Sequence, residues 1–189
     1  MITIIGNGES RKRINIDKIP GFKIGCNGIY LYNKVDMICA MDKFWIDKIE
    51  KETSIPLISR KNNTSFQTTL QLRENGKWTN TKCLYRSYCS GITALDYMCF
   101  THPHETFYMI GFDFGYDGEV VNHMYKGQKF GPKLDGKAQN ENIFLKQYIE
   151  TLKRYPRYNI IWVNNSRKDF GFNRIPVREY LRLIRNYCN

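Results

Sequence analysis

The feature that most constrains this chain is a short apolar segment that runs directly into a glycine turn near the N-terminus. Residues Ile2–Ile5 are almost entirely apolar, and Gly6, Asn7, Gly8 and Ser10 follow at once. Glycine lets the backbone turn sharply and approach a ligand with no Cβ in between. Open α/β sheets bind ligands at the carboxyl ends of their strands. We therefore expect this turn to form the floor of a nucleotide pocket.

The rest of the chain repeats the alternation of strand and helix. Asn75-Gly76 predicts a hairpin turn inside the polar stretch 60–82, and the glycine- and lysine-rich residues 117–137 predict a mobile loop. No internal repeat or linker interrupts the pattern, which predicts one α/β domain over residues 1–189. Further strands are expected at 22–26, 35–41, 55–58, 106–110 and 159–163, and helices at 44–52, 92–100, 142–153 and from Pro176 onward.

Composition excludes several classes of protein. Hydrophobic residues make up 42% of the 189 residues, which argues against wholesale disorder. No apolar run reaches about 18 residues and no secretory signal begins the chain, so we expect no membrane span and a cytoplasmic location. The six cysteines form neither a C-x-x-C pair nor a zinc spacing. We interpret them as reduced core thiols.

The chain is strongly basic, with 29 Lys and Arg against 18 Asp and Glu and a net charge of +11. The surplus gathers at 11–13, 126–137, 153–157 and 167–185. Such a field attracts nucleic acid, a nucleotide donor or a phosphorylated glycan. The alternative is an ordinary solvated surface that happens to be rich in lysine.

Small polar residues stand where four of the expected strands end: Asn7, Asn27, Asp42, and Asn165 with Ser166. Asparagine offers both a donor and an acceptor, which suits a base edge or ribose hydroxyls. Ser90 and Gly91 open an apolar helix, where Ser90 is well suited to cap and free amides can bind phosphate. Ordinary turn chemistry is the competing interpretation, because Asn, Gly and Ser dominate turns.

These segments together resemble a known family. The motifs IIGNGES, GCNGIY, CSGITALDYMCF and FYMIGFDFGY follow one another over residues 1–116, and WVNNS follows near 165. In order and approximate spacing they are similar to the bacterial sialyltransferases of the Campylobacter lipooligosaccharide type and to related glycosyltransferases of bacteria and phages. The resemblance implies a Rossmann-like (GT-A-like) domain with a mostly parallel central sheet flanked by helices. It also implies a metal-independent glycosyltransferase that uses a cytidine-monophosphate sugar donor.

The resemblance assigns donor-binding roles by position. Asn7, Gly8 and Asn27 match residues that contact the nucleotide, and Ser90 with Gly91 match those that hold the phosphate or sugar. Arg86 resembles the arginine that faces the sialic acid carboxylate, with one extra residue before Ser-Gly. Asp42 replaces a family asparagine, and a carboxylate beside an anionic sugar is unfavourable. The full predicted donor site is Asn7, Gly8, Ser10, Asn27, Asp42, Arg86, Ser90, Gly91, Asn165 and Ser166.

The catalytic base departs from the family pattern. The position that matches the family histidine falls near Gly136-Lys137, where there is none, but the same loop holds His123. A histidine there is suited to deprotonate an acceptor hydroxyl, and an exposed loop histidine is the alternative. Asp113 is the second candidate base, although its G-x-D-F setting also suits a structural turn. No D-x-D pair suggests a metal site, so we expect no metal cofactor and only the nucleotide sugar as co-substrate.

The acceptor is less constrained. Basic residues interleaved with aromatics between 155 and 174, followed by a basic terminal helix, suit a nucleic acid backbone and hence modified bases of phage DNA. A glycan acceptor competes with that hypothesis. Two non-enzymatic functions remain as alternatives. One is a protein that binds or sequesters a nucleotide without catalysis, and the other is a basic nucleic-acid-binding protein. The chain leaves open whether it forms a homo-oligomer.

Overall fold

The computed structural model describes residues 1–60, 69–113, 141–165 and 170–187. A single nine-stranded sheet draws its strands from the whole of this range, in the order β6-β5-β4-β3-β2-β1-β7-β8-β9. The strands are β1 (Ile2–Ile5), β2 (Phe22–Cys26), β3 (Met37–Cys39), β4 (Leu57–Ser59), β5 (Thr69–Glu74), β6 (Lys77–Leu84), β7 (Thr106–Ile110), β8 (Asn159–Val163) and β9 (Arg174–Ile175).

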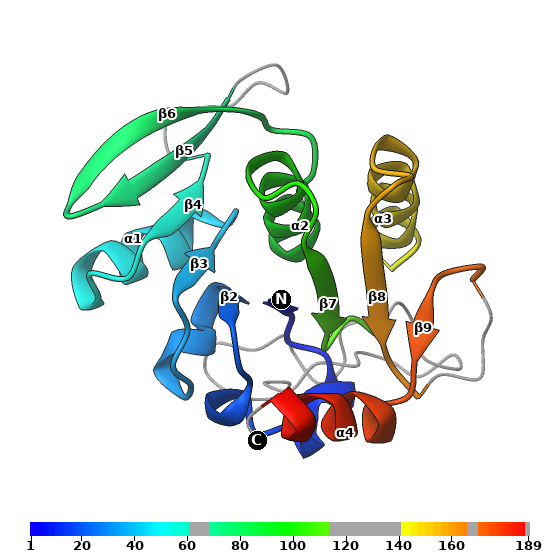
Figure 1. The fold of residues 1–189 in the computed structure, drawn as a ribbon. Coiled ribbons are helices and arrows are strands. Elements are labelled where there is room, and N and C mark those ends of the chain that lie inside the picture. The colour runs from blue at the N-terminus through cyan, green and yellow to red at the C-terminus, as the bar shows by residue number, and fades with distance from the viewer. Residues whose placement is uncertain (61–68, 114–140, 166–169, 188–189) are drawn as a thin grey trace.

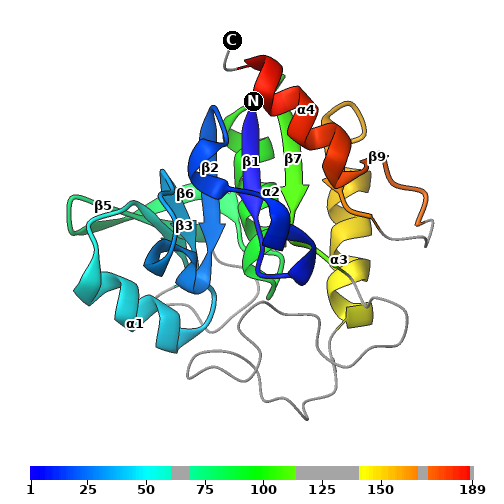
Figure 2. The same ribbon diagram turned by 90° about the horizontal axis from the view of Figure 1, so that it is seen from below.

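The sheet is mostly parallel, as the sequence predicts. Neighbouring strands from β4 to β9 pair in parallel, and only β5 and β6 add an antiparallel hairpin at one edge. The chain builds outward from β1 to β4 on one side and later resumes at β7 on the other side of β1 (Figure 2). The direction of winding therefore reverses between β1 and β7.

Helices cover both faces of the sheet. Figure 1 shows α2 (Ser90–Thr101) and α3 (Glu141–Arg154) on one face, with α4 (Val177–Tyr187) on the opposite face. Helix α1 (Lys43–Glu52) packs into the same apolar cluster as α4. Short 3-10 segments η1 (Glu9–Arg13), η2 (Ile16–Lys18) and η3 (Asn27–Leu31) connect the first strands.

Strand β1 shows why two cores form. Successive side chains of a strand point to opposite faces. Ile4 therefore joins the cluster under α2 and α3 with Tyr148 and Trp162, whereas Ile5 joins the cluster with Tyr180. All five side chains are fully buried. This two-sided burial explains why β1 is an apolar run rather than an alternating one.

A buried ion pair joins the two helices of one face. Asp96 on α2 is 3% exposed, and its Oδ1 accepts hydrogen bonds from Arg154 Nη2 at 3.1 Å and Nε at 3.3 Å. The hydroxyl of Tyr155 donates to the Asp96 carbonyl at 3.3 Å. The polar residue in the middle of an apolar helix is thus held by Arg154 at the end of α3 and by Tyr155 just after it.

Most predicted elements are confirmed, with corrections at their ends. The predicted strand 35–41 shrinks to Met37–Cys39, and the predicted strand 55–58 shifts to Leu57–Ser59. Asn75 (φ 49°) and Gly76 (φ 76°) form the predicted turn, between β5 and β6. The predicted mobile loop 117–137 lies outside the described residues. No helix in the described ranges is long and apolar enough to cross a membrane.

Candidate functional site at the carboxyl ends of the strands

The loops after β1 and β7 are hydrogen-bonded to each other where the winding reverses. The amide of Gly6 donates to the Ile110 carbonyl at 2.8 Å, and the amide of Gly8 donates to the Gly111 carbonyl at 2.8 Å. These two bonds continue the pairing of β1 with β7 beyond the sheet. The turn that the sequence singles out is therefore rigidly attached to a second loop, 105 residues later.

Asp113 holds three loops together at this junction. Its Oδ2 accepts a hydrogen bond from the Ser10 amide at 3.1 Å, and its Oδ1 accepts one from Asn164 Nδ2 at 3.0 Å. The residue is 6% exposed. Burial raises the pKa of Asp113, and the hydrogen bonds from Ser10 and Asn164 act in the opposite direction. With both oxygens engaged, the geometry gives Asp113 a structural role in the loops after β1, β7 and β8.

Two glycines serve packing rather than ligand access. A Cβ on Gly8 would lie 2.6 Å from Asp113 Oδ2, and a Cβ on Gly91 would lie 2.0 Å from Cε1 of Phe112. The space beside each glycine is therefore filled by the loop after β7. These glycines allow that loop to approach β1 and α2 closely.

A second set of contacts ties β2, β3 and α2 together. Asn27 lies directly after β2 with a left-handed backbone (φ 53°), and its Oδ1 accepts a hydrogen bond from Ser90 Oγ at 3.0 Å. Ser90 Oγ also accepts from the Met41 amide at 3.2 Å. The predicted cap is thus wrong in its position. Cys89 is the N-cap of α2, and the Ser90 hydroxyl instead bridges two strand ends.

Asn7 leaves one acceptor unused between β1 and β2. Its Nδ2 donates to the Cys26 carbonyl at 3.3 Å, which fixes the orientation of the amide. Its Oδ1 is buried and has no hydrogen-bond partner among the described residues. A buried acceptor without a donor costs about 1–3 kcal/mol. Such groups normally find a protein, water or ligand donor, so Asn7 Oδ1 marks a position where a ligand N–H or O–H would be stabilised.

The rim of the site carries residues that the sequence analysis did not select. Arg60 Nε donates to the Met41 carbonyl at 3.2 Å, which places its guanidinium over two aromatic rings. Arg60 Cζ lies 5.6 Å from the ring centre of Tyr85 and 5.9 Å from that of Tyr88. Tyr88 is 48% exposed. Burial raises the pKa of Tyr85, and the negative charge of Asp42 raises it further. The exposed carboxylate of Asp42 therefore lies near the same rim.

Cysteines line the inner side of this edge. Cys26 and Cys39 are register partners in β2 and β3, and both are buried free thiols. Burial raises the pKa of Cys26, Cys39 and Cys89, while the amides of Gly91 and Ile92 lower that of Cys89. The thiols are therefore neutral at physiological pH, and the first amides of α2 face sulfur. No group of three metal-ligating side chains occurs in the described ranges.

The remaining predicted residues do not join this cluster. Arg86 is exposed, and its charge lowers the pKa of the Cys83 thiol against the larger effect of burial. Asn165 Oδ1 accepts from the Val177 amide at 3.0 Å, so this side chain helps to start α4. The candidate base His123 and Ser166 lie outside the described residues.

Comparison of the chain with protein-family models, with curated proteins and with solved structures finds no match. The resemblance to sialyltransferases therefore rests on the short motifs alone.

Proposed function

We propose that this protein binds a nucleotide sugar at the carboxyl edge of its sheet and transfers the sugar to a hydroxyl acceptor. Support comes first from topology. The strands wind outward in both directions from β1 and β7. In doubly wound, Rossmann-like sheets ligands bind in the crevice where the strand order reverses. Asn7 follows β1, one of the two strands at that reversal, and its side chain lies on the β2 side, where it donates to the Cys26 carbonyl.

The unpaired Oδ1 of Asn7 is the observation that carries the proposal. The same side chain donates to the carbonyl of Cys26, the residue before Asn27, and Asn27 in turn accepts from Ser90 Oγ. A base or ribose donor would satisfy the Asn7 acceptor. The resemblance favours cytidine monophosphate as the nucleotide.

In the proposed reaction the acceptor oxygen forms a bond to the anomeric carbon while the bond from that carbon to the donor phosphate breaks. The acceptor proton needs a base, and general-base catalysis is worth about 10²–10⁴ in rate. Asp113 is a poor choice because both of its oxygens already accept hydrogen bonds. We therefore assign the base to His123 as a proposal.

A binding protein without turnover is the second candidate. The observation that favours it is the engagement of Asp113, the one predicted catalytic residue that the structure describes. Such a protein would keep the nucleotide site and sequester its ligand.

A thermal-shift panel of CMP, CDP, UDP, GDP and CMP-sialic acid, without added metal, tests the nucleotide site. Ligand at 100 times its Kd stabilises the fold by about 2.7 kcal/mol. For a chain of this size that is a rise in Tm of about 5–11 °C. We expect selective stabilisation by cytidine nucleotides. No shift with any nucleotide would overturn the proposal.

Variants at Asn7 localise the effect. Asn7→Ala removes the unpaired acceptor and should weaken cytidine nucleotide binding about tenfold, the equivalent of one hydrogen bond. Asn173→Ala is the matched control, because this exposed asparagine donates only to Asn159 Oδ1 at 3.2 Å, remote from the site. Equal effects from both variants would remove Asn7 from the site.

Release of CMP from CMP-sialic acid separates the two candidates. The transferase predicts release that depends on an added acceptor and falls at least 10²-fold in His123→Ala. Tight binding without release, unchanged by that substitution, would establish the sequestering function.

A further inference from the structure

A basic groove lies along α4, and its lining residues do not include Asn7, Asn27 or Ser90. Its volume is about 550 Å³. Val177 and Leu181 contribute apolar side chains to the lining, and four arginines contribute positive charge. The lining residues are Arg13, Asn165, Val177, Arg178, Leu181, Arg182 and Arg185.

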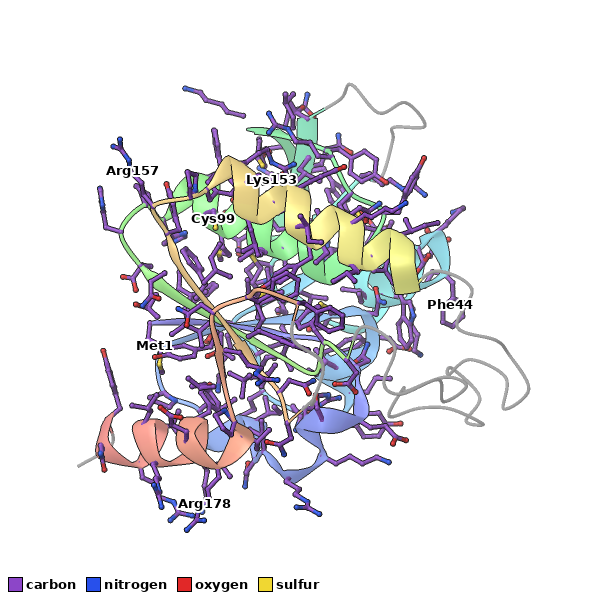
Figure 3. All side chains as sticks on the ribbon, turned by 90° about the vertical axis from the view of Figure 1, so that its right-hand side faces the viewer. Met1, Phe44, Cys99, Lys153, Arg157 and Arg178 are labelled. Atoms are coloured by element: carbon purple, nitrogen blue, oxygen red, sulfur yellow. The ribbon has the colours of Figure 1, made fainter. Side chains whose placement is uncertain are left out.

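Three of the arginines form one row along the helix. Arg178, Arg182 and Arg185 are spaced by four and three residues, which places them on one side of α4. At 1.5 Å per residue the row spans about 10 Å. Arg13, at the end of η1, adds a fourth guanidinium from across the groove. In Figure 3 the labelled Arg178 points away from the sheet.

The opposite side of α4 is already occupied by the core. Val177, Tyr180 and Ile184 are buried against the sheet, and the Tyr180 hydroxyl is hydrogen-bonded to Thr3 Oγ1 at 3.1 Å. A helix that inserts into a membrane surface needs its apolar face free. The face that α4 presents to solvent carries the arginine row together with two exposed apolar side chains, Leu183 and Tyr187. The predominance of charge on that face favours a polyanion over a lipid bilayer.

The described residues give these four guanidiniums no carboxylate partner. Arg13, Arg178, Arg182 and Arg185 are all exposed, and none of them forms an ion pair within the described ranges. By contrast, Arg154 elsewhere in the chain pairs with Asp96. Four guanidiniums gathered around one groove repel each other, and a ligand with several phosphates reduces that repulsion.

We propose that this groove binds the phosphodiester backbone of a nucleic acid. A row about 10 Å long matches successive phosphates better than a single phosphate group, and guanidinium binds phosphate in a bidentate fork. Backbone contacts of this kind carry no base specificity. The proposal concerns a surface separate from the Asn7 site, and it holds whether or not the nucleotide-sugar proposal does.

Fluorescence anisotropy of a labelled mixed-sequence 20-base-pair duplex, titrated at 50 to 200 mM salt, tests the groove. Four phosphate contacts predict a slope of log K against log salt near −3.6, which is about a 150-fold loss of affinity over that range. The triple variant Arg178→Gln/Arg182→Gln/Arg185→Gln should reduce the slope by about 2.7, to about −0.9. Its affinity for the duplex should then fall only about fourfold between 50 and 200 mM salt.

A charge-matched variant separates the groove from overall charge. Lys146→Gln/Lys153→Gln/Arg157→Gln removes three exposed cations from and just after α3, on the other face of the sheet. Figure 3 shows Lys153 and Arg157 on the side opposite Arg178. This control should keep the wild-type slope to within about 0.5.

Three results would overturn the proposal: no duplex binding at 50 mM salt, equal flattening by both triple variants, or arginine-dependent binding to anionic phospholipid vesicles without duplex binding. Thermal melting of both triple variants checks that they fold. The nucleotide thermal shift of the same variants should stay unchanged, which separates failure of this proposal from failure of the nucleotide site.

Discussion

Replacing Asp113 with alanine tests whether this carboxylate holds the edge of the sheet together. It accepts hydrogen bonds from the Ser10 amide and Asn164 Nδ2 at 3.1 and 3.0 Å. Hydrogen bonds to a charged group contribute about 1.5–3 kcal/mol each, or about 3–6 kcal/mol for the two. Desolvation of the carboxylate, which raises its pKa, opposes this gain. We expect a net loss of about 2–4 kcal/mol in the free energy of unfolding.

Urea unfolding and thermal melting measure the effect. In a domain of 150–250 residues each kcal/mol lowers Tm by about 2–4 °C, so Asp113→Ala should lose about 4–16 °C. Asp36→Ala is the matched control. Asp36 Oδ2 also accepts a backbone amide, from Lys23 at 2.7 Å, but it is exposed. Its loss should cost about 0.5–1.5 kcal/mol.

Two outcomes would refute the structural assignment of Asp113. If Asp113→Ala is no more destabilising than Asp36→Ala, the junction does not hold the loops as argued. If Asp113→Ala keeps full stability and abolishes CMP release, the carboxylate acts in the reaction instead. Loss of stability together with retained nucleotide binding in the folded fraction would agree with the geometry.

One shifted pKa and two buried contacts lead to further measurable effects. Because burial raises the pKa of Asp113, its contribution to stability is fully present below the unfolded pKa of about 3.9 and is lost as pH rises through the folded pKa. The wild-type advantage over Asp113→Ala in paired urea titrations should therefore grow from pH 7 to pH 4; a constant difference would contradict this sign. Gly91→Ala places a Cβ 2.0 Å from Phe112 Cε1 and should cost about 1–3 kcal/mol of overpacking, measured by thermal melting. Asp96→Ala leaves Arg154 unpaired; because that side chain is 27% exposed, we expect about 1–3 kcal/mol rather than the 3–5 typical of a fully buried pair, and an unchanged urea midpoint would show that the pair contributes nothing.

Strand positions were predictable where local pattern and tertiary packing agree. The apolar runs at β1, β2, β7 and β8 have the predicted limits, because parallel strands buried on both faces need continuous apolar segments. Strand β3 was overestimated. It pairs with β2 over only three residues, and the side chain of Asp36 turns back to accept the Lys23 amide just before it. A predominantly apolar segment therefore does not by itself set the length of a strand; the pairing with its neighbours does.

The site was only partly predictable. Asn7, Asn27 and Ser90 were selected from their places after strands or at a helix start, and the structure brings these three to one edge. Arg60 could not be predicted from the sequence, because its role comes from a tertiary contact between the residue after β4 and Tyr88 before α2. For the tyrosines, the only sequence hint was that Tyr85 and Tyr88 both lie shortly before Ser90.

By itself the sequence determined the fold class, the order of strands along the chain and the polar character of the strand ends, since periodicity and turn residues are local properties. Tertiary structure decided what those residues do. It assigned Gly8 and Gly91 to close packing, engaged both oxygens of Asp113, left Asn7 Oδ1 without a donor and gathered four arginines around one groove. Each of these depends on segments far apart in the chain, and the order of strands in the sheet sets which of them meet.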